Sequence, residues 1–236
     1  MGRGGGQALR YRRIEMTETA LQDAPPASGY YGNARPEMLE FIPATAHRLL
    51  DVGCSEGRFG AAVKSEMPGC EVWGVEPFAD AAAEAARRLD KVINAGLAEA
   101  EASLPSGYFD VIVMNDVLEH IDYSEPALAT AKRLLSPGGS LVLSLPNVRY
   151  FLNVRDLLFR KDWEYVDQGV LDRTHLRFFT QKSATRLLQD NGFEITTVKG
   201  ITRAHLKLHY RLLFALSRRL FADMPYLQFA FVCRPA

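Results

Sequence analysis

The stretch Leu49-Leu50-Asp51-Val52-Gly53-Cys54-Ser55-Glu56-Gly57-Arg58-Phe59-Gly60 decides the fold. An apolar run leads into two glycines, and a helical pattern follows over residues 58–66. This order predicts a β-strand, a tight turn and an α-helix, in which Gly53 and Gly57 let the backbone approach a ligand closely. In an open α/β sheet such a ligand lies beyond the carboxyl ends of the strands, where the strand order reverses.

Similar apolar runs return along the chain and alternate with helical patterns. We predict strands at 48–53, 71–76, 91–95, 109–114, 140–145, 193–198 and 227–233, with helices at 58–66, 80–89, 126–135 and 180–191. Near-continuous apolar runs are typical of strands buried on both faces of a parallel sheet, and the alternation predicts βαβ units. We therefore expect an α/β, doubly wound, Rossmann-like domain. Its sheet should have seven mostly parallel strands, an antiparallel C-terminal strand and an insertion after strand 5.

The length of 236 residues suits one such domain. We expect residues 1–28, rich in Gly, Arg, Pro and Ala, to be a mobile leader, and residues 29–236 to form a single domain. Residues 147–180 are predicted to be an insertion that caps the substrate. Residues 203–221 are predicted to form one or two amphipathic helices, which would face the core, a second subunit or a lipid surface.

Composition excludes several classes of protein. The 28 basic and 28 acidic residues give zero net charge, so we expect no nucleic-acid partner. No apolar run reaches the ~20 residues that a membrane span needs. Three scattered cysteines without a CxxC pair predict a reducing, cytoplasmic location. These observations leave an oligomer possible.

The glycine turn departs from the dinucleotide-binding fingerprint, in which glycines would stand where Ser55 and Arg58 are found. Asp51 heads the turn, where it would repel a pyrophosphate but suit a cationic ligand. Glu76 ends the second strand 25 residues later, and its carboxylate can accept hydrogen bonds from ribose hydroxyls. The structural alternatives are a plain tight turn and a solvent-facing glutamate before Pro77.

Five segments are informative through their order and spacing along the chain: residues 50–57, 74–77, 109–112, 115–120 and 135–139. Together they resemble the class I S-adenosylmethionine-dependent methyltransferases. The resemblance implies that the cofactor is S-adenosylmethionine and that the product is S-adenosylhomocysteine. It covers roughly residues 30 to 200.

The resemblance also implies the cofactor contacts, residue by residue. Six residues would lie beside the methionine part: Asp51, Gly53, Cys54, Gly57, Asn115 and Asp116. Glu76 would bind the ribose. Four residues would lie near the adenine: Pro77, Phe78, Ala98 and Glu99. Leu97 stands where many relatives carry Asp, which puts the adenine amino contact in doubt. Tyr30 or Tyr31 would close the pocket, and Arg35 would meet the methionine carboxylate. The alternative for this N-terminal segment is an aromatic patch that packs the leader on the core.

The acceptor side is less defined. The stretch from Pro146 to Thr180 resembles small bacterial methyltransferases of sugar and cell-surface polysaccharide pathways, which implies a sugar-linked hydroxyl or carboxyl acceptor. A hydroxyl acceptor needs a base, and His175 is the first candidate, followed by Asp172 and His120. The alternative is a structural cluster that fastens the insertion to the sheet.

The spacing of His and carboxylate residues shows no zinc or magnesium pattern, so we expect no metal. Two other functions stay open at this point. One is a nicotinamide-dependent oxidoreductase on a similar sheet. The other is a non-catalytic, methyltransferase-like module that binds the cofactor without turnover.

Overall fold

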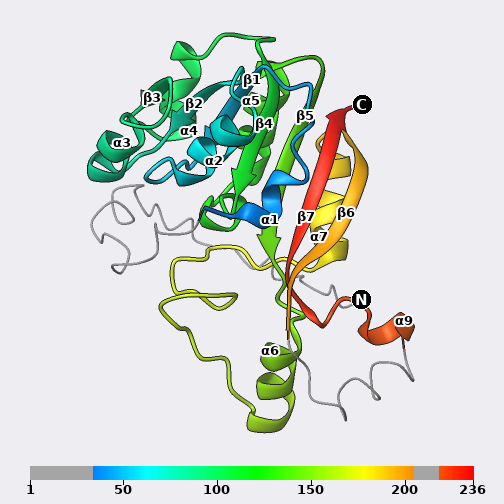
Figure 1. The fold of residues 1–236 in the computed structure, drawn as a ribbon. Helices are drawn as coiled ribbons and strands as arrows, with labels where there is room; N and C mark the ends of the chain where they lie inside the picture. The colour runs from blue at the N-terminus through cyan, green and yellow to red at the C-terminus, as the bar shows by residue number, and fades with distance from the viewer. Residues whose placement is uncertain (1–33, 205–217) are drawn as a thin grey trace, which may run out of the picture.

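Seven strands form one sheet in the order β3-β2-β1-β4-β5-β7-β6 (Figure 1). The computed structural model describes residues 34–204 and 218–236. The strands are β1 Arg48–Val52, β2 Glu71–Val75, β3 Lys91–Ile93, β4 Phe109–Asn115, β5 Leu135–Pro146, β6 Phe193–Arg203 and β7 Tyr226–Pro235. Strands β1 to β5 pair in parallel, and β7 runs antiparallel between β5 and β6. The predicted fold class is confirmed.

The strand order reverses at β1, because β1 pairs with β2 on one side and with β4 on the other. The chain leaves β1 through the glycine turn and leaves β4 through Asn115 and Asp116. Both segments therefore meet at the same edge of the sheet. In open α/β sheets this is the position where ligands bind.

Helices cover both faces of the sheet, because the strand side chains alternate between two apolar cores. Leu49 and Val113 face the core shared with helices α1 Pro36–Leu39, α2 Arg58–Glu66 and α3 Ala79–Ala85. Leu50 and Met114 face the core shared with α4 Leu97–Ala100, α5 Ser124–Leu134 and α7 Gln181–Asp190. The two cores bury the strands on both faces of the sheet, and the candidate site lies at the carboxyl edge of these strands.

The segment between β5 and α7 lies beyond the carboxyl ends of the parallel strands (Figure 1). It contains α6 Phe151–Arg155, which continues as the π-helical turn η5 Asp156–Arg160. An irregular chain follows and returns to the sheet body through a bridge between Asn147 and Phe179. This position agrees with the predicted insertion. Its role as a substrate cap stays a prediction.

Several boundaries differ from those predicted. The strand β5 begins at Leu135, five residues early, because Leu135 pairs with Phe109 before the Ser-Pro-Gly-Gly turn is complete. The strand β6 extends to Arg203 because its long register with β7 supplies partners. Arg203 therefore belongs to a strand and not to the helical segment expected at 203–221, of which α9 covers Arg218–Phe221. The rest of that segment, at 205–217, and the leader at 1–28 lie outside the described residues.

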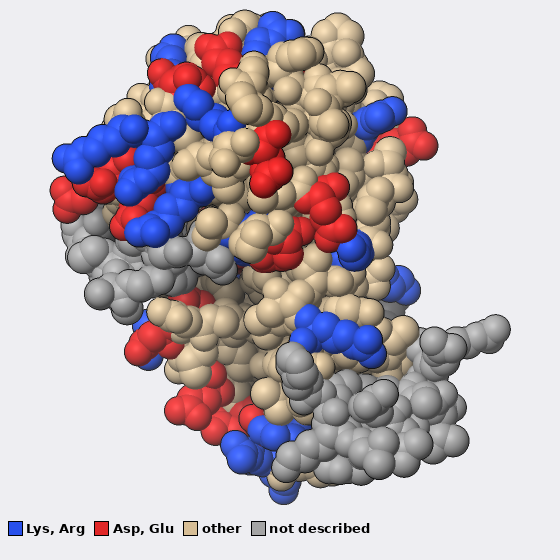
Figure 2. Space-filling view, viewed as in Figure 1, with Lys and Arg blue, Asp and Glu red and all other residues tan. Residues whose placement is uncertain are grey.

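Among the described residues, no helix has both the length and the apolar character to cross a membrane. On the face drawn in Figure 2, basic and acidic side chains lie next to one another, as the balanced net charge predicts.

Candidate cofactor and acceptor site

The turn after β1 exposes backbone at the carboxyl edge of the sheet. Gly53, Ser55 and Gly57 have positive φ angles of 68°, 51° and 75°. The N–H groups of Gly53 and Cys54 both donate to the carbonyl of Val75, at 2.8 and 3.2 Å, which fixes the turn against β2. A Cβ at Gly53 would lie 3.0 Å from a methyl group of Val117. Position 53 therefore favours glycine, because a side chain there would meet both backbone strain and crowding.

Two carboxyl groups are buried side by side beneath the turn. Asp51 is 2% exposed and Glu76 is 3% exposed. Glu76 accepts hydrogen bonds from the N–H groups of Ser55, at 2.8 Å, and Phe78, at 3.1 Å. Burial, and then the charge of Glu76, raises the pKa of Asp51 to about 8. Burial also raises the pKa of Glu76. The buried carboxyl pair therefore favours a ligand that carries a positive charge or hydroxyl donors.

Arg35 and Asp116 form the centre of a network at the ends of β4, β5 and β7. Their side chains are ion-paired, and Arg35 also contacts Glu37 at 2.7 Å. The guanidinium donates to the Ser144 hydroxyl at 3.2 Å and to Gln228 Oε1 at 3.1 Å. Gln228 Nε2 donates to both carboxylate oxygens of Asp116, at 2.8 and 2.9 Å. Asp116 thus lies directly after β4, at the carboxyl edge of the sheet, and Arg35 is held beside it.

Unpaired polar atoms gather at the same edge. Within the described part of the chain, Asp51 Oδ2, the Ser55 hydroxyl and the amide group of Asn115 are buried without a hydrogen-bond partner. Buried polar groups are nearly always paired, so a group of exceptions marks a place where a polar ligand completes them. S-adenosylmethionine carries ribose hydroxyls, an amino acid end and a positive sulfonium. The donors, acceptors and carboxylates at this edge fit those groups.

The residues expected near the adenine occupy the next corner of the sheet. Pro77 is exposed and Phe78 is half-buried, while Ala98 and Glu99 are exposed on α4. Asn94, which sequence reasoning missed, donates to the carbonyls of Glu76 and Pro77, both at 2.9 Å. It fixes the path of the turn after β2. Tyr30 and Tyr31 lie outside the described residues.

Sequence reasoning also missed Ser144 and Gln228. Their contact with Asp116 follows from the pairing of β5 with β7, in which Ser144 lies opposite Ala230 and Pro146 opposite Gln228. One serine and one glutamine, each in an apolar strand, form no local sequence motif. An alignment of the strand registers is the signal that would have found them.

The residues expected on the acceptor side lie on η4 Leu118–His120 and at 172–177 of the insertion. His120 and His175, both predicted, come together with ring centroids 4.8 Å apart. Asp172 is 2% exposed and accepts hydrogen bonds from the N–H and the hydroxyl of Thr174, at 2.8 and 2.7 Å. Burial, and then the neighbouring His175, lowers the pKa of His120, so this imidazole is neutral at neutral pH. Figure 2 shows the surface hollowed between the sheet body and the segment below it.

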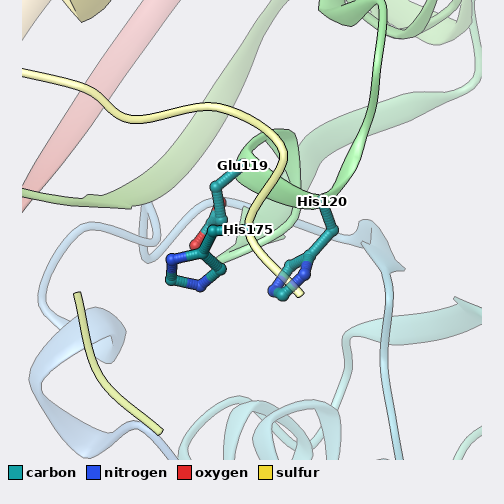
Figure 3. A group of neighbouring side chains, drawn as sticks. All are labelled: Glu119, His120 and His175. Atoms are coloured by element: carbon teal, nitrogen blue, oxygen red, sulfur yellow. The ribbon is translucent and has the colours of Figure 1, made fainter. Parts of the chain in front are cut away.

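Glu119 lies beside the two histidines, and it was not predicted as a site residue. It is fully buried, and its carboxylate has no hydrogen-bond partner in the described part of the chain. Burial, and then the charge of Asp116, raises the pKa of Glu119. Figure 3 shows Glu119 and His120 extending from η4 and His175 from the insertion. Backbone hydrogen bonds fasten the insertion to η4, because the N–H groups of Leu176 and Arg177 donate to the Glu119 carbonyl at 2.8 and 3.1 Å.

A family model described as a methyltransferase domain matches residues 21–198, about three quarters of the chain. The chain belongs to the methyltransferase domain family. The family membership that the motifs predict is thereby confirmed, together with S-adenosylmethionine as the cofactor of this domain.

Curated relatives of this methyltransferase domain include the mitochondrial ubiquinone biosynthesis O-methyltransferase of Rattus norvegicus. The two are 27% identical over 169 residues, which cover 67% of this chain and 48% of the rat protein. The chain thus spans about half the length of that relative. The ubiquinone biosynthesis O-methyltransferase of Burkholderia pseudomallei strain 1710b is 28% identical over 178 residues, covering 70% of this chain and 74% of that protein.

Solved structures share the fold of this methyltransferase domain. A SAM-dependent methyltransferase from Archaeoglobus fulgidus superposes with a TM-score of 0.61 at 19% identity, covering 84% of this chain and 90% of that chain. One from Mesorhizobium loti gives a TM-score of 0.59 at 20% identity, over 86% and 98% of the two chains.

Proposed function

We propose that this chain transfers a methyl group from S-adenosylmethionine to a hydroxyl oxygen of a small-molecule acceptor. The buried carboxyl pair Asp51 and Glu76, at the switch point of the sheet, is the observation that carries the proposal. S-adenosylmethionine supplies an activated methyl group on a positively charged sulfur. A site that places carboxylates around that charge and excludes water favours direct displacement.

Each part of the turn has a task in this proposal. Glu76 Oε1 and Oε2 each accept one backbone hydrogen bond and keep further lone pairs for the ribose hydroxyls. Asp51 and Asp116 supply negative charge at the methionine end. Arg35 holds Asp116 in place and offers its positive charge to the methionine carboxylate.

The acceptor side supports an oxygen atom as the nucleophile. The relatives from rat and Burkholderia are named as O-methyltransferases of ubiquinone biosynthesis. A hydroxyl must lose its proton as it attacks, and His120 and His175 stand together where the insertion meets η4. Asp172 is engaged by Thr174, so we assign it the positioning of this loop and not proton transfer. A phenolic or a sugar-linked hydroxyl both meet these requirements.

Calorimetric titration with S-adenosylhomocysteine tests the cofactor site. We expect micromolar binding by the wild-type chain, at least tenfold weaker in Glu76→Gln, which corresponds to a loss of ~1.4 kcal/mol or more. Glu125→Gln, an exposed glutamate on α5, is the matched control and should bind as the wild type does. Preference for NAD would instead identify an oxidoreductase and overturn the proposal.

Turnover is tested with methyl-labelled S-adenosylmethionine and two acceptor panels, one of phenols and catechols and one of sugars and sugar nucleotides. Label on an acceptor oxygen supports the proposal and assigns the acceptor class. Cofactor binding without labelled product in either panel would indicate a binding module without turnover, and label on nitrogen or carbon would contradict O-methylation.

A further inference from the structure

Glu119, His120 and His175 form a cluster of potential metal ligands at the acceptor side of the site (Figure 3). One ligand atom of each side chain lies within 4.8 Å of the others. Two of them belong to η4 and the third to the insertion. The cluster therefore exists only because the insertion docks on η4, through hydrogen bonds from Leu176 and Arg177 to the Glu119 carbonyl.

The burial of the Glu119 carboxyl group favours a bound cation. It is 0% exposed, and neither of its oxygens has a hydrogen-bond partner in the described part of the chain. Burying a carboxylate without compensation is costly, and proteins normally pair such a group or use it to coordinate a metal. Arg35, the nearby positive side chain, is engaged by Asp116 and Glu37. A cation from outside the chain would satisfy Glu119.

The histidines are oriented as metal ligands are. His175 Nδ1 lies 3.0 Å from the carbonyl of Val170. A carbonyl only accepts hydrogen bonds, so Nδ1 carries the proton and Nε2 carries the lone pair. His120 Nδ1 lies 3.3 Å from the carbonyl of Thr174, which favours the same tautomer. Metal-binding histidines typically donate their second N–H to a carbonyl or carboxylate in this way.

We propose that Glu119, His120 and His175 bind a divalent transition-metal cation. Two imidazoles and one carboxylate suit zinc, manganese or iron(II) better than calcium, which prefers oxygen ligands alone. With metal–ligand bonds of about 2.0–2.2 Å, two ligand atoms lie at most about 4.4 Å apart. The cluster thus needs only a small closing movement of its side chains to form the site.

The cation would act on the acceptor, and this role rests on the proposed function. Three protein ligands leave coordination positions open for an acceptor oxygen. With both histidines coordinated to the cation, the proton of a bound hydroxyl passes to water and not to a histidine, and the cation makes its release easier. Its oxygen then forms a bond to the methyl carbon while the sulfur–methyl bond breaks and its electron pair stays on sulfur. The cation is an addition to the cofactor and not a replacement for it.

Metal binding is measured directly on the full-length, chelator-treated chain without cofactor, with Zn²⁺ by calorimetry and Co²⁺ by its visible absorption. We expect one cation per chain, bound at least tenfold more weakly by Glu119→Gln and His175→Gln. The matched controls are Glu125→Gln and His47→Gln, which alter exposed side chains and should bind as the wild type does. Circular dichroism verifies that each variant is folded.

A second measurement keeps the proposal testable if the buried variants do not fold. Pulsed electron paramagnetic resonance of the Cu²⁺-loaded chain counts bound imidazoles in a His205→Gln, His209→Gln background. Two bound imidazoles support the site. Fewer than two, or no stoichiometric Zn²⁺ binding, or binding that Glu119→Gln and His175→Gln leave unchanged, would overturn the proposal.

The failure of this inference is distinguishable from failure of the proposed function. Binding of S-adenosylhomocysteine without stoichiometric binding of Zn²⁺ removes the metal site alone. Stoichiometric binding of Zn²⁺ by a chain that binds no S-adenosylhomocysteine keeps the metal site and removes the methyl-transfer role.

Discussion

At the scale of single residues, the site depends on charges placed where water is excluded. Asp51 is buried beside Glu76, which favours the protonated form of its carboxyl in the ligand-free chain. A positively charged ligand reverses this preference, because it stabilises the ionised form. The same burial that selects for a cation therefore makes the ligand-free chain sensitive to pH.

We predict that Asp51→Asn flattens the dependence of stability on pH. The unfolded chain releases the Asp51 proton near 3.8, while the folded chain keeps it up to a pKa of about 8. The folded state thus binds more protons over this range, so the free energy of unfolding of the wild type falls as pH rises through it. The loss between pH 5 and pH 8 is at most roughly 4 kcal/mol.

Urea unfolding of ligand-free wild type and Asp51→Asn at several pH values measures this effect. The variant should lose less stability between pH 5 and pH 8 than the wild type does. Asp122→Asn, which changes an exposed carboxylate, should follow the wild-type curve. Parallel curves for the wild type and Asp51→Asn would show that burial does not hold this proton.

At the scale of elements, the insertion is attached to the sheet by a few buried contacts. Asn147 is 1% exposed and follows directly after β5. Its amide group donates to the carbonyls of Asp223 and Tyr226, at 2.9 and 3.0 Å, and accepts from the N–H of Arg149 at 3.1 Å. One side chain thus joins the start of the insertion to the start of β7.

We predict that Asn147→Ala lowers the free energy of unfolding by about 2–3 kcal/mol, because it removes three hydrogen bonds made by a buried side chain. Asn153→Ala is the control, since that half-buried amide makes only a 3.5 Å hydrogen bond to the Val148 carbonyl and should cost less than ~1 kcal/mol. Urea denaturation gives both values. Equal losses in the two variants would mean that Asn147 does not anchor the insertion.

At the scale of the whole molecule, the sequence predicts the structural features that depend on local patterns of residues. Apolar runs predict the strands, and the order of Asp51, Gly53 and Gly57 predicts the turn and the cofactor edge. Sequence reasoning could not predict that Glu119 would meet His175, because the connecting segment has no clear period and its docking depends on backbone hydrogen bonds to η4. Contacts between distant segments are tertiary, and no local motif encodes them.

The Arg35 network is the broadest of these contacts, since it joins α1, β4, β5 and β7. We predict that Arg35 and Asp116 are coupled by about 1–3 kcal/mol in a double-mutant cycle of Arg35→Ala and Asp116→Asn, because the pair is largely shielded from water. Asparagine tolerates the positive φ of 54° at position 116, so this variant removes charge without adding strain.

The exposed pair of Lys199 and Glu40, with side chains 52% and 50% exposed, is the matched control for this cycle. Its coupling should stay below ~1 kcal/mol, because water and salt screen it. Arg35→Ala should also weaken S-adenosylhomocysteine binding, since Arg35 both positions Asp116 and offers charge to the methionine carboxylate. If the two cycles give equal coupling, the four elements are held together by packing alone, and the position of Asp116 at the methionine end does not depend on Arg35.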